Sequence, residues 1–454
     1  MHKTKTPYKI PAPLTCDPRD IENGVSMELV RKYIKKHEGY LRRYEYLGNL
    51  YKGFHDVYLE PEKEDWKPDN RLAVNFPRYM TETFAGYGYG IPIQVTHEDD
   101  AVNEAVQGFG KNNEISDHDA EMVKLCCEYG HGWEYLYQDE EANTKISAFT
   151  PIELFTVYDD TIKNRALFSI RYGRHDYESD RPGEEYGEVM TAEEIKNFDN
   201  GAFTEVKDNP YGYIPVVEWK LNDERIGLYE NVAGLIEAYN HTIGEKANDV
   251  DAFAEAYLAV MGAKLEDDQV YHIRDDRLIN IYGTDNAKDI LVQFLQKPTA
   301  DGTQEHLLDR LQDHIYETSM VANISDDTFG SSTSGVSLAY KLQAMSNLAL
   351  AFDRKIEKSL RKRYKIWSSL STNTTDKDMW QEIDIRFTRN LPKNLKEEAE
   401  VASQLGGVVS KETQLSVMPS IVPDVSVELE RLDEEKKESA ALTGMFAEEV
   451  TDDE

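Results

Sequence analysis

Residues 325–335 read Ser-Asp-Asp-Thr-Phe-Gly-Ser-Ser-Thr-Ser-Gly, and residues 336–370 continue as VSLAYKLQAMSNLALAFDRKIEKSLRKRYKIWSSL. The first stretch is small and polar, which is typical of a flexible loop. The second places apolar side chains at three- and four-residue steps, from Leu338 through Phe352 to Tyr364, and so predicts one continuous helix. At ~1.5 Å per residue this helix spans about 50 Å, which is too long for a small compact domain.

Two shorter helices precede the loop and enclose a small insert. Residues 229–260 carry apolar side chains at helical spacing, among them Leu235 and Tyr239, and Gly262 is a natural terminator. Residues 304–324 repeat the pattern. Strand-like runs in the insert lie at 270–273, 278–282 and 290–295. The second half of the chain is therefore predicted to be a helical frame with a small insert that contains strands.

The first half predicts short helices and mostly antiparallel strands. Helices are predicted over 26–52, capped by Ser26, from Asn75 to Phe84, and over 115–130, capped by Ser116. The glycine-rich run 86–90 is expected to end the second of these helices. Strands are predicted over 91–95, 133–137, 145–149, 155–158, 166–172, 186–190 and 215–219. Residues 72–220 thus form an α+β domain. After the long helix we expect a strand over 383–387 and helices over 395–405, from Ser410, and over 425–441.

The composition argues against several classes of protein. The 454 residues, 52.0 kDa in all, suffice for two to four domains. Lys+Arg number 51 and Asp+Glu 85, and the net charge of −34 is unsuited to tight clamping of phosphates but compatible with letting DNA slide past. Three cysteines cannot build a disulfide framework, and no apolar run approaches the roughly 18 residues of a membrane span. We therefore expect a protein of a reducing, intracellular compartment without membrane contact.

Enzymatic and metal signatures are weak. Cys126 and Cys127 with His131 lack the second pair of ligands that a zinc site needs. Nucleotide-binding, nucleophile-elbow and zinc-protease motifs are absent from the sequence. We expect no enzymatic activity, no metal and no cofactor. One basic cluster has two possible interpretations. The first is charge pairing near a helix end, including pairs between subunits, and the second is contact with DNA or a capsid. Its members are Lys355, Lys358, Arg361, Lys362, Arg363 and Lys365.

Several segments, taken in order, resemble one protein family. They are Pro151-Ile152-Glu153 with 157–160, Asn209 to Val217, Gly227 to Leu258, Phe329 to Val336, Leu391-Pro392 and Ser410 to Thr413. Together with the order of elements, they resemble the portal proteins of long-tailed (Siphoviridae-like) bacteriophages over about residues 20–440. The resemblance implies an α+β portal fold with an α/β wing, long stem helices, a small α/β clip insert, a long tunnel-to-wing helix and a helical crown.

The resemblance also implies how the chain divides. Residues 1–20 would be an N-terminal arm and 21–226 the wing, which the strand at 380–392 completes. Residues 227–262 and 304–324 would be the stem helices, with the clip at 263–303 between them. The tunnel loop would be 325–335, the long helix 336–371 and the crown 393–441. Residues 442–454 are an acidic end that we expect to be disordered.

Three groups of candidate functional residues follow from the resemblance. The tunnel loop would contact DNA through Asp326, Asp327, Thr328, Phe329, Gly330, Ser331, Ser332, Thr333 and Ser334. Acidic candidates for the channel wall are Glu245, Asp249, Glu255, Asp309 and Asp313. An acidic wall repels phosphate and keeps the barrier to sliding low. Candidates for docking of partners at the clip are Arg274, Arg277 and Lys288.

The function that the resemblance implies is that of a ring-forming channel, usually of twelve copies, at one capsid vertex. The terminase large subunit would package double-stranded DNA through it without sequence specificity, and the DNA would later be ejected by the same route. Further implied partners are the major capsid protein, the scaffold and a head-completion or adaptor protein. The ring would nucleate procapsid assembly in the host cytoplasm and remain in the virion. The alternatives are a cytoplasmic α+β enzyme with a helical oligomerisation bundle and another ring-forming head–tail connector without motor docking, a class that is generally much shorter than 454 residues.

Overall fold

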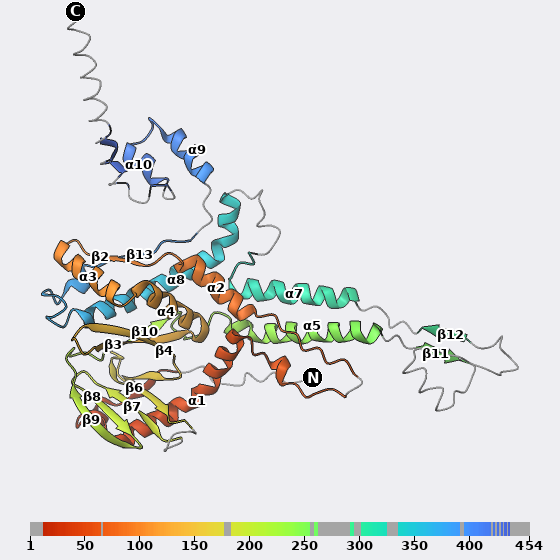
Figure 1. Ribbon diagram of the computed structural model, residues 1–454, viewed down its shortest axis with the longest axis horizontal. Helices are drawn as coiled ribbons and strands as arrows, with labels where there is room; N and C mark the ends of the chain where they lie inside the picture. Colours follow the sequence, from red (N-terminus) through yellow and green to blue (C-terminus); the bar gives the residue numbers. More distant parts are fainter. Residues whose placement is uncertain are drawn as a thin grey trace, which may run out of the picture. The chain divides into compact units, whose positions relative to one another are not determined.

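The computed structural model describes residues 12–64, 67–176, 183–254, 258–261, 291–294, 301–324, 335–390, 395–418, 421–422 and scattered residues from 425 to 435. The chain forms two compact units, Met1–Phe329 with Lys341–Arg389, and Gly330–Tyr340 with Asn390–Glu454. The first unit combines helices with small sheets, which confirms the α+β class (Figure 1). Within the described ranges, helices long and apolar enough to cross a membrane are absent.

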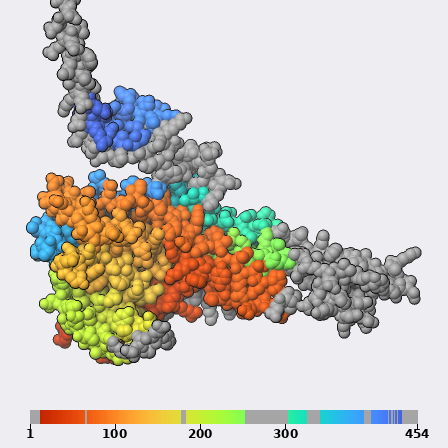
Figure 2. Space-filling model, viewed as in Figure 1, coloured from red at the N-terminus to blue at the C-terminus, as the bar shows by residue number. Residues whose placement is uncertain are grey.

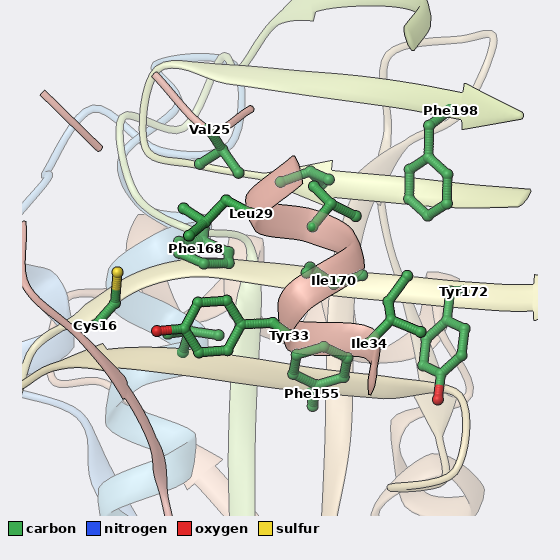
Figure 3. Close-up of a cluster of buried hydrophobic side chains, with 13 residues drawn as sticks. Cys16, Val25, Leu29, Tyr33, Ile34, Phe155, Phe168, Ile170, Tyr172 and Phe198 are labelled. Atoms are coloured by element: carbon green, nitrogen blue, oxygen red, sulfur yellow. The ribbon is translucent and has the colours of Figure 1, made fainter. Parts of the chain in front are cut away.

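A six-stranded sheet and one helix form the first core. The sheet order is β1 (Leu14–Cys16), β5 (Leu154–Asp159), β6 (Ala166–Arg174), β7 (Glu185–Met190), β8 (Glu194–Asp199) and β9 (Ala202–Asp208), with only the β1–β5 pair parallel. Helix α1 (Met27–Lys52) begins at Ser26, whose Oγ accepts a hydrogen bond from the Leu29 amide at 3.3 Å, as predicted. Figure 3 shows Tyr33 and Ile34 of α1 lying against Phe155 and Phe168 of the sheet.

A three-stranded sheet forms the second core, in the order β10 (Val216–Lys220), β3 (His131–Gln138) and β4 (Thr144–Phe149). Helix α4 (Ile115–Tyr129) leads into β3 through Gly130, which has a φ of +84°. A Cβ atom at Gly130 would lie 2.2 Å from the carbonyl oxygen of Arg225, so only glycine fits this crossing. The sheet therefore holds α4 at a fixed position.

The long helix α8 (Gly335–Trp367) lies where the periodicity predicts it. Its stripe of Ala349, Phe352, Ile356, Leu360 and Tyr364 is buried. The Phe352 ring packs 5.3 Å from the Tyr89 ring of α2 (Phe76–Tyr89), and the Tyr364 ring packs 6.0 Å from the Phe109 ring of α3 (Asp100–Asn112). Strand β2 (Gln94–Thr96) pairs with β13 (Asp384–Arg386), which follows α8. The helix is thus the centre of this part of the unit.

Helices α5 (Ala233–Ala254) and α7 (Asp301–Ser319) lie side by side (Figure 1). The short helix η3 (Glu230–Val232) precedes α5. Strands β11 (Leu258–Met261) and β12 (Leu291–Phe294) pair between them, which confirms the predicted strand at 290–295. The other short helices are η1 (Pro18–Ile21), η2 (Asp56–Leu59) and η5 (Met379–Gln381). In the second unit, α9 (Leu395–Leu405) and α10 (Lys411–Ser416) lie where predicted, and Ser410 Oγ accepts from the Thr413 amide at 3.2 Å.

Besides the helix predicted over 304–324, which runs over Asp301–Ser319 and ends before Met320 with its positive φ of +61°, three sequence predictions of helix ends are wrong. Helix α2 does begin after Asn75, but it continues through the glycine run to Tyr89. The buried rings of Tyr87 and Tyr89 outweigh the low helix propensity of glycine, about 1 kcal/mol each. Helix α4 begins at Ile115 after Glu114, so Ser116 is not its cap.

The third error concerns the helix predicted over 229–260. It ends at Ala254, because the apolar run from Leu258 suits a strand as well as a helix and pairs with β12. Helix α3 and strands β8 and β9 were not predicted at all. The predicted strands at 270–273 and 278–282 lie outside the described residues, as do most of the predicted helix at 425–441 and the acidic end.

Candidate functional site

One face of α5 is covered by residues 53–64 and 67–74 of the same chain, which we call the covering segment. His55 Nδ1 lies 2.8 Å from Glu237, and the Val74 amide donates to Asn240 at 2.8 Å. Lys63 forms an ion pair with Glu245 at 2.6 Å. In Figure 2 the covering segment is the orange surface directly beside the green of α5. The acids on this face are therefore partnered within the chain.

A different face of α5 meets α7. Gln304 donates to Asp249 at 3.2 Å, and Lys246 pairs with Glu305. At 3.6 residues per turn, positions 237, 241 and 245 lie within about 80° of the helix surface, Asp249 follows Glu245 by about 40°, and Lys246 lies about 100° from Glu245. Helix α5 thus lies between the covering segment and α7, and both Glu245 and Asp249 have partners at these contacts.

The outer face of α7 carries the remaining described acidic candidates. Leu308 and Ile315 are buried, whereas Asp309 and Asp313 are exposed. Within the described ranges neither carboxylate forms an ion pair or a hydrogen bond. Their charges therefore act on whatever solution or molecule faces α7. Glu255, the tunnel-loop residues 325–334 and the clip candidates Arg274, Arg277 and Lys288 lie outside the described residues.

A buried ion cluster fixes the C-terminal half of α8. Arg363 pairs with Asp119 of α4 at 2.6 Å and with Glu134 of β3, and its guanidinium lies 5.2 Å from the Trp219 ring. His118 Nε2 lies 3.0 Å from Glu134. Burial raises the pKa of Asp119. Burial would also raise the pKa of Glu134, but Arg363 and His118 outweigh it and hold that pKa at about 2.

Side-chain ligand atoms of His118, Asp119 and Glu134 lie within 4.8 Å of one another, an arrangement that a metal ion could use. The guanidinium of Arg363 already supplies the positive charge at this place. Because a cation on the carboxylates would displace or repel Arg363, the cluster is a structural ion pair.

The other cations of the basic cluster are mostly engaged within the chain. Lys362 is half-buried, donates from its ammonium to the Val216 carbonyl at 2.9 Å, and has its pKa lowered to about 8 by desolvation. Lys355 pairs with Asp223 at 2.6 Å and Arg361 with Glu357 at 3.0 Å. Lys365 lies 4.9 Å from the Trp380 ring. These contacts favour charge pairing over contact with DNA, and the pairs form inside one chain.

A second buried cluster joins β10, β3 and the chain leading to α5. Glu218 accepts from Arg225 at 2.5 Å and lies 3.1 Å from His131 Nδ1. Burial would raise the pKa of Glu218, but Arg225 and His131 hold it well below the ordinary value. Nearby, Arg43 of α1 pairs with Glu230 of η3. The sequence analysis identified neither the Glu218–Arg225 pair nor the Arg43–Glu230 pair.

The predicted weakness of the Cys126, Cys127 and His131 group as a metal site agrees with the geometry. Both ring nitrogens of His131 have protein partners, Glu218 and the Tyr44 hydroxyl at 3.0 Å. Both cysteines are buried on α4, and burial raises the pKa of each thiol.

Comparison with known proteins places this chain among phage assembly proteins. Residues 30–441 match the family described as phage portal protein, SPP1 Gp6-like. The portal protein of Bacillus phage SPP1 is 23% identical over 419 residues, covering 86% of this chain and 81% of that protein. Chains in solved structures of a gene transfer agent, the neck of the empty particle and the native virion, are 11% identical, with TM-scores of 0.42 and 0.41. Each match covers 75% of this chain and 88% of the other.

Proposed function

The chain belongs to the family of SPP1 Gp6-like phage portal proteins, and on this basis we propose that it forms a ring-shaped channel at one vertex of a phage capsid. Portal proteins are structural components of assembly, so the enzyme alternative is set aside. The observation that carries the proposal is the match over 412 of 454 residues (441 − 30 + 1), which includes the α5/α7 pair and the long helix α8.

In this proposal about twelve copies surround the channel, and double-stranded DNA passes through it during packaging and ejection. Helices α5 and α7 are the stem, 263–303 is the clip, and 325–335 is the tunnel loop. Arg274, Arg277 and Lys288 belong to the docking surface for the terminase large subunit and later a head-completion protein. The wing meets the major capsid protein and scaffold. The small side chains of the loop suit contact with DNA without a tight grip, because Lys and Arg are absent from its sequence.

The contacts of the acidic residues refine the proposed channel wall. Asp309 and Asp313 are exposed on α7 and unpaired among the described residues, so we assign them to the lumen. Glu245 and Asp249 are partnered by Lys63 and Gln304, so their main contribution is to hold the stem together. Glu255 remains a candidate for the channel wall only because of its position in the sequence. An acidic lumen repels the phosphates and so prevents DNA from binding to the wall.

Electron microscopy of the purified protein, with native mass spectrometry, tests the proposal. We expect closed rings of about twelve subunits with a central hole. A monomer or dimer at every salt concentration, also after co-expression with the capsid and scaffold proteins, would contradict it.

A deletion tests the tunnel loop separately. Removing residues 328–334 should leave ring formation unchanged and reduce DNA packaging, because the loop is proposed to contact DNA rather than neighbouring subunits. The control removes seven residues of the acidic end, 442–448, and should affect neither. Loss of rings on deleting the loop, or normal packaging without it, would contradict the assignment.

A further inference from the structure

The exposed face of α1 carries five cations in a strongly acidic protein. They are Arg31, Lys32, Lys35, Lys36 and Arg42, which we call the basic face. Ion pairs from these five are absent within the described part of the chain. Lys36 lies 4.5 Å from the Tyr33 ring, and Arg31 lies against Gly201. The cations of the basic face are therefore available to pair with a partner outside their own chain.

The fold fixes the direction of the basic face. The opposite side of α1 is buried in the core, with Leu29, Tyr33 and Ile34 packed on the six-stranded sheet (Figure 3). At 3.6 residues per turn the five cations occupy about 140° of the helix surface, and Glu28 is the acid among them. Because the helix cannot rotate without exposing its apolar side, the cations stay on the surface.

A matching acidic surface lies on α3 and the first half of α4, which we call the acidic corner. Its members are the exposed residues Glu98, Asp99, Asp100, Glu104, Glu114, Asp117 and Glu121. Asp99 caps α3 by accepting from the Val102 amide at 3.0 Å. Ion pairs from any of the seven are absent among the residues that the structure describes, and Lys111 is the only lysine or arginine between 98 and 121. The acidic corner thus has a large surplus of negative charge.

The basic face and the acidic corner lie on different sides of the first unit. Helices α1 and α4 meet near their C-terminal ends, where the Tyr44 and Tyr129 rings are 6.0 Å apart. Four cations of the basic face lie in the N-terminal half of α1 and Arg42 lies just beyond its midpoint, whereas the acidic corner occupies α3 and the N-terminal half of α4. Figure 1 accordingly shows α3 and α1 at opposite edges of the unit. The two surfaces therefore cannot pair within one copy.

We propose that the basic face of each copy docks on the acidic corner of the next copy in the ring. This inference rests on the proposed function, because a ring needs a heterologous interface that joins two different surfaces of identical copies. Copies with a net charge of −34 repel one another, and a contact between opposite charges offsets part of that repulsion. A phosphate ligand would account for the basic face but would leave the acidic corner without a partner.

Charge reversal on each surface, alone and together, tests the proposal. Lys35→Glu with Arg42→Glu reverses the basic face, and Glu104→Lys with Glu121→Lys reverses the acidic corner at mid-helix positions. Each pair should raise the protein concentration needed for half-maximal ring formation by about tenfold or more, because like charges then face each other. The combined variant with all four substitutions should return toward the wild-type value. Mass photometry at several salt concentrations measures the rings, and thermal unfolding verifies that each variant is folded.

Two results would overturn the proposal. One is normal ring formation by the Lys35→Glu, Arg42→Glu variant; if this variant also loses retention of duplex DNA, the basic face binds phosphate instead. The other is a combined variant that forms rings no better than the worse of the two double variants. A wild-type protein that forms no rings would instead contradict the proposed function itself, so the two failures are distinguishable.

Discussion

Charged side chains on the C-terminal half of α8 and on the outer face of α7 lie in contrasting environments. On α8, Arg363 and Asp353 are buried and have partners on other elements of the same chain. On α7, Asp309 and Asp313 are exposed and unpaired among the described residues. A buried charge must be matched inside the protein, whereas an exposed charge acts on its surroundings. Helix α8 therefore uses charge to fix the fold, whereas α7 has charge available for function.

Removing the central cation of α8 should have the largest effect. Arg363→Met leaves Asp119 and Glu134 buried without their counter-ion, and we expect the free energy of unfolding to fall by about 3–5 kcal/mol. Arg354→Met is the matched control, since Arg354 is exposed on the same helix, and it should change stability by less than about 0.5 kcal/mol. Urea denaturation measures both, and equal effects would contradict the structural role of Arg363.

Lowering the pH should destabilise the fold through its buried histidines. Burial lowers the pKa of His37 and of His131 to about 4, whereas histidine in an unfolded chain has a pKa of about 6.5. Between these values the unfolded chain binds protons that the folded chain does not. Stability should therefore fall as pH decreases from about 6.5 to about 4, by up to about 3 kcal/mol for each histidine. Glu134, whose folded pKa is about 2, should add a further loss below about pH 4.5.

A series of urea unfolding curves from pH 7 to pH 4.5 measures this dependence. His37→Gln should flatten it, because one of the two buried histidines is then absent. His241→Gln, at an exposed position on α5, is the control and should leave the slope unchanged. A slope that does not respond to His37→Gln would show that other groups cause it.

The contact between α8 and the segment after β13 should have an intermediate effect. Asp353 accepts from the Tyr89 hydroxyl at 2.9 Å and pairs with Arg389. Asp353→Asn removes the counter-ion of Arg389 and should lower the free energy of unfolding by about 2 kcal/mol. Asp384→Asn breaks the exposed pair with Arg386 and should cost less than about 1 kcal/mol. Thermal or urea unfolding that ranks the two variants the other way would contradict the account.

Neutralising the α7 acids should have the smallest effect on stability. Asp309→Asn with Asp313→Asn should change the free energy of unfolding by less than about 0.5 kcal/mol, since both side chains are exposed. Rings of this variant should retain duplex DNA more strongly at low salt, because the wall repels phosphate less. Glu245→Gln with Asp249→Asn is the control and should leave DNA retention unchanged. The assignment of the lumen fails if the two variants retain DNA equally.

The sequence predicts the elements whose pattern is local. The apolar stripe from Leu338 to Tyr364 predicts α8 to within a few residues of its observed ends, and Ser26 and Ser410 mark true helix starts. One missed hairpin had a local signal as well. Asn200 and Gly201 both have positive φ between β8 and β9, and Asn-Gly between alternating runs is a strong hairpin indicator.

The ion clusters could not be predicted, because their partners are distant in the sequence. Glu134 stands alone as an acid in the buried run of β3, which suggests a buried partner. Nothing local identifies that partner as Arg363, 229 positions away. In the same way, the sequence alone predicts one charged surface for the acids of α5. The structure shows that the covering segment pairs with two of them, Glu237 and Glu245.

A single-particle reconstruction of the assembled ring tests whether the exposed acids of α7 face the channel. The account predicts that Asp309 and Asp313 of every copy line the central channel, while Glu245 stays paired with Lys63 of its own chain. A ring in which α7 faces away from the channel, with the lumen lined by other elements, would contradict it.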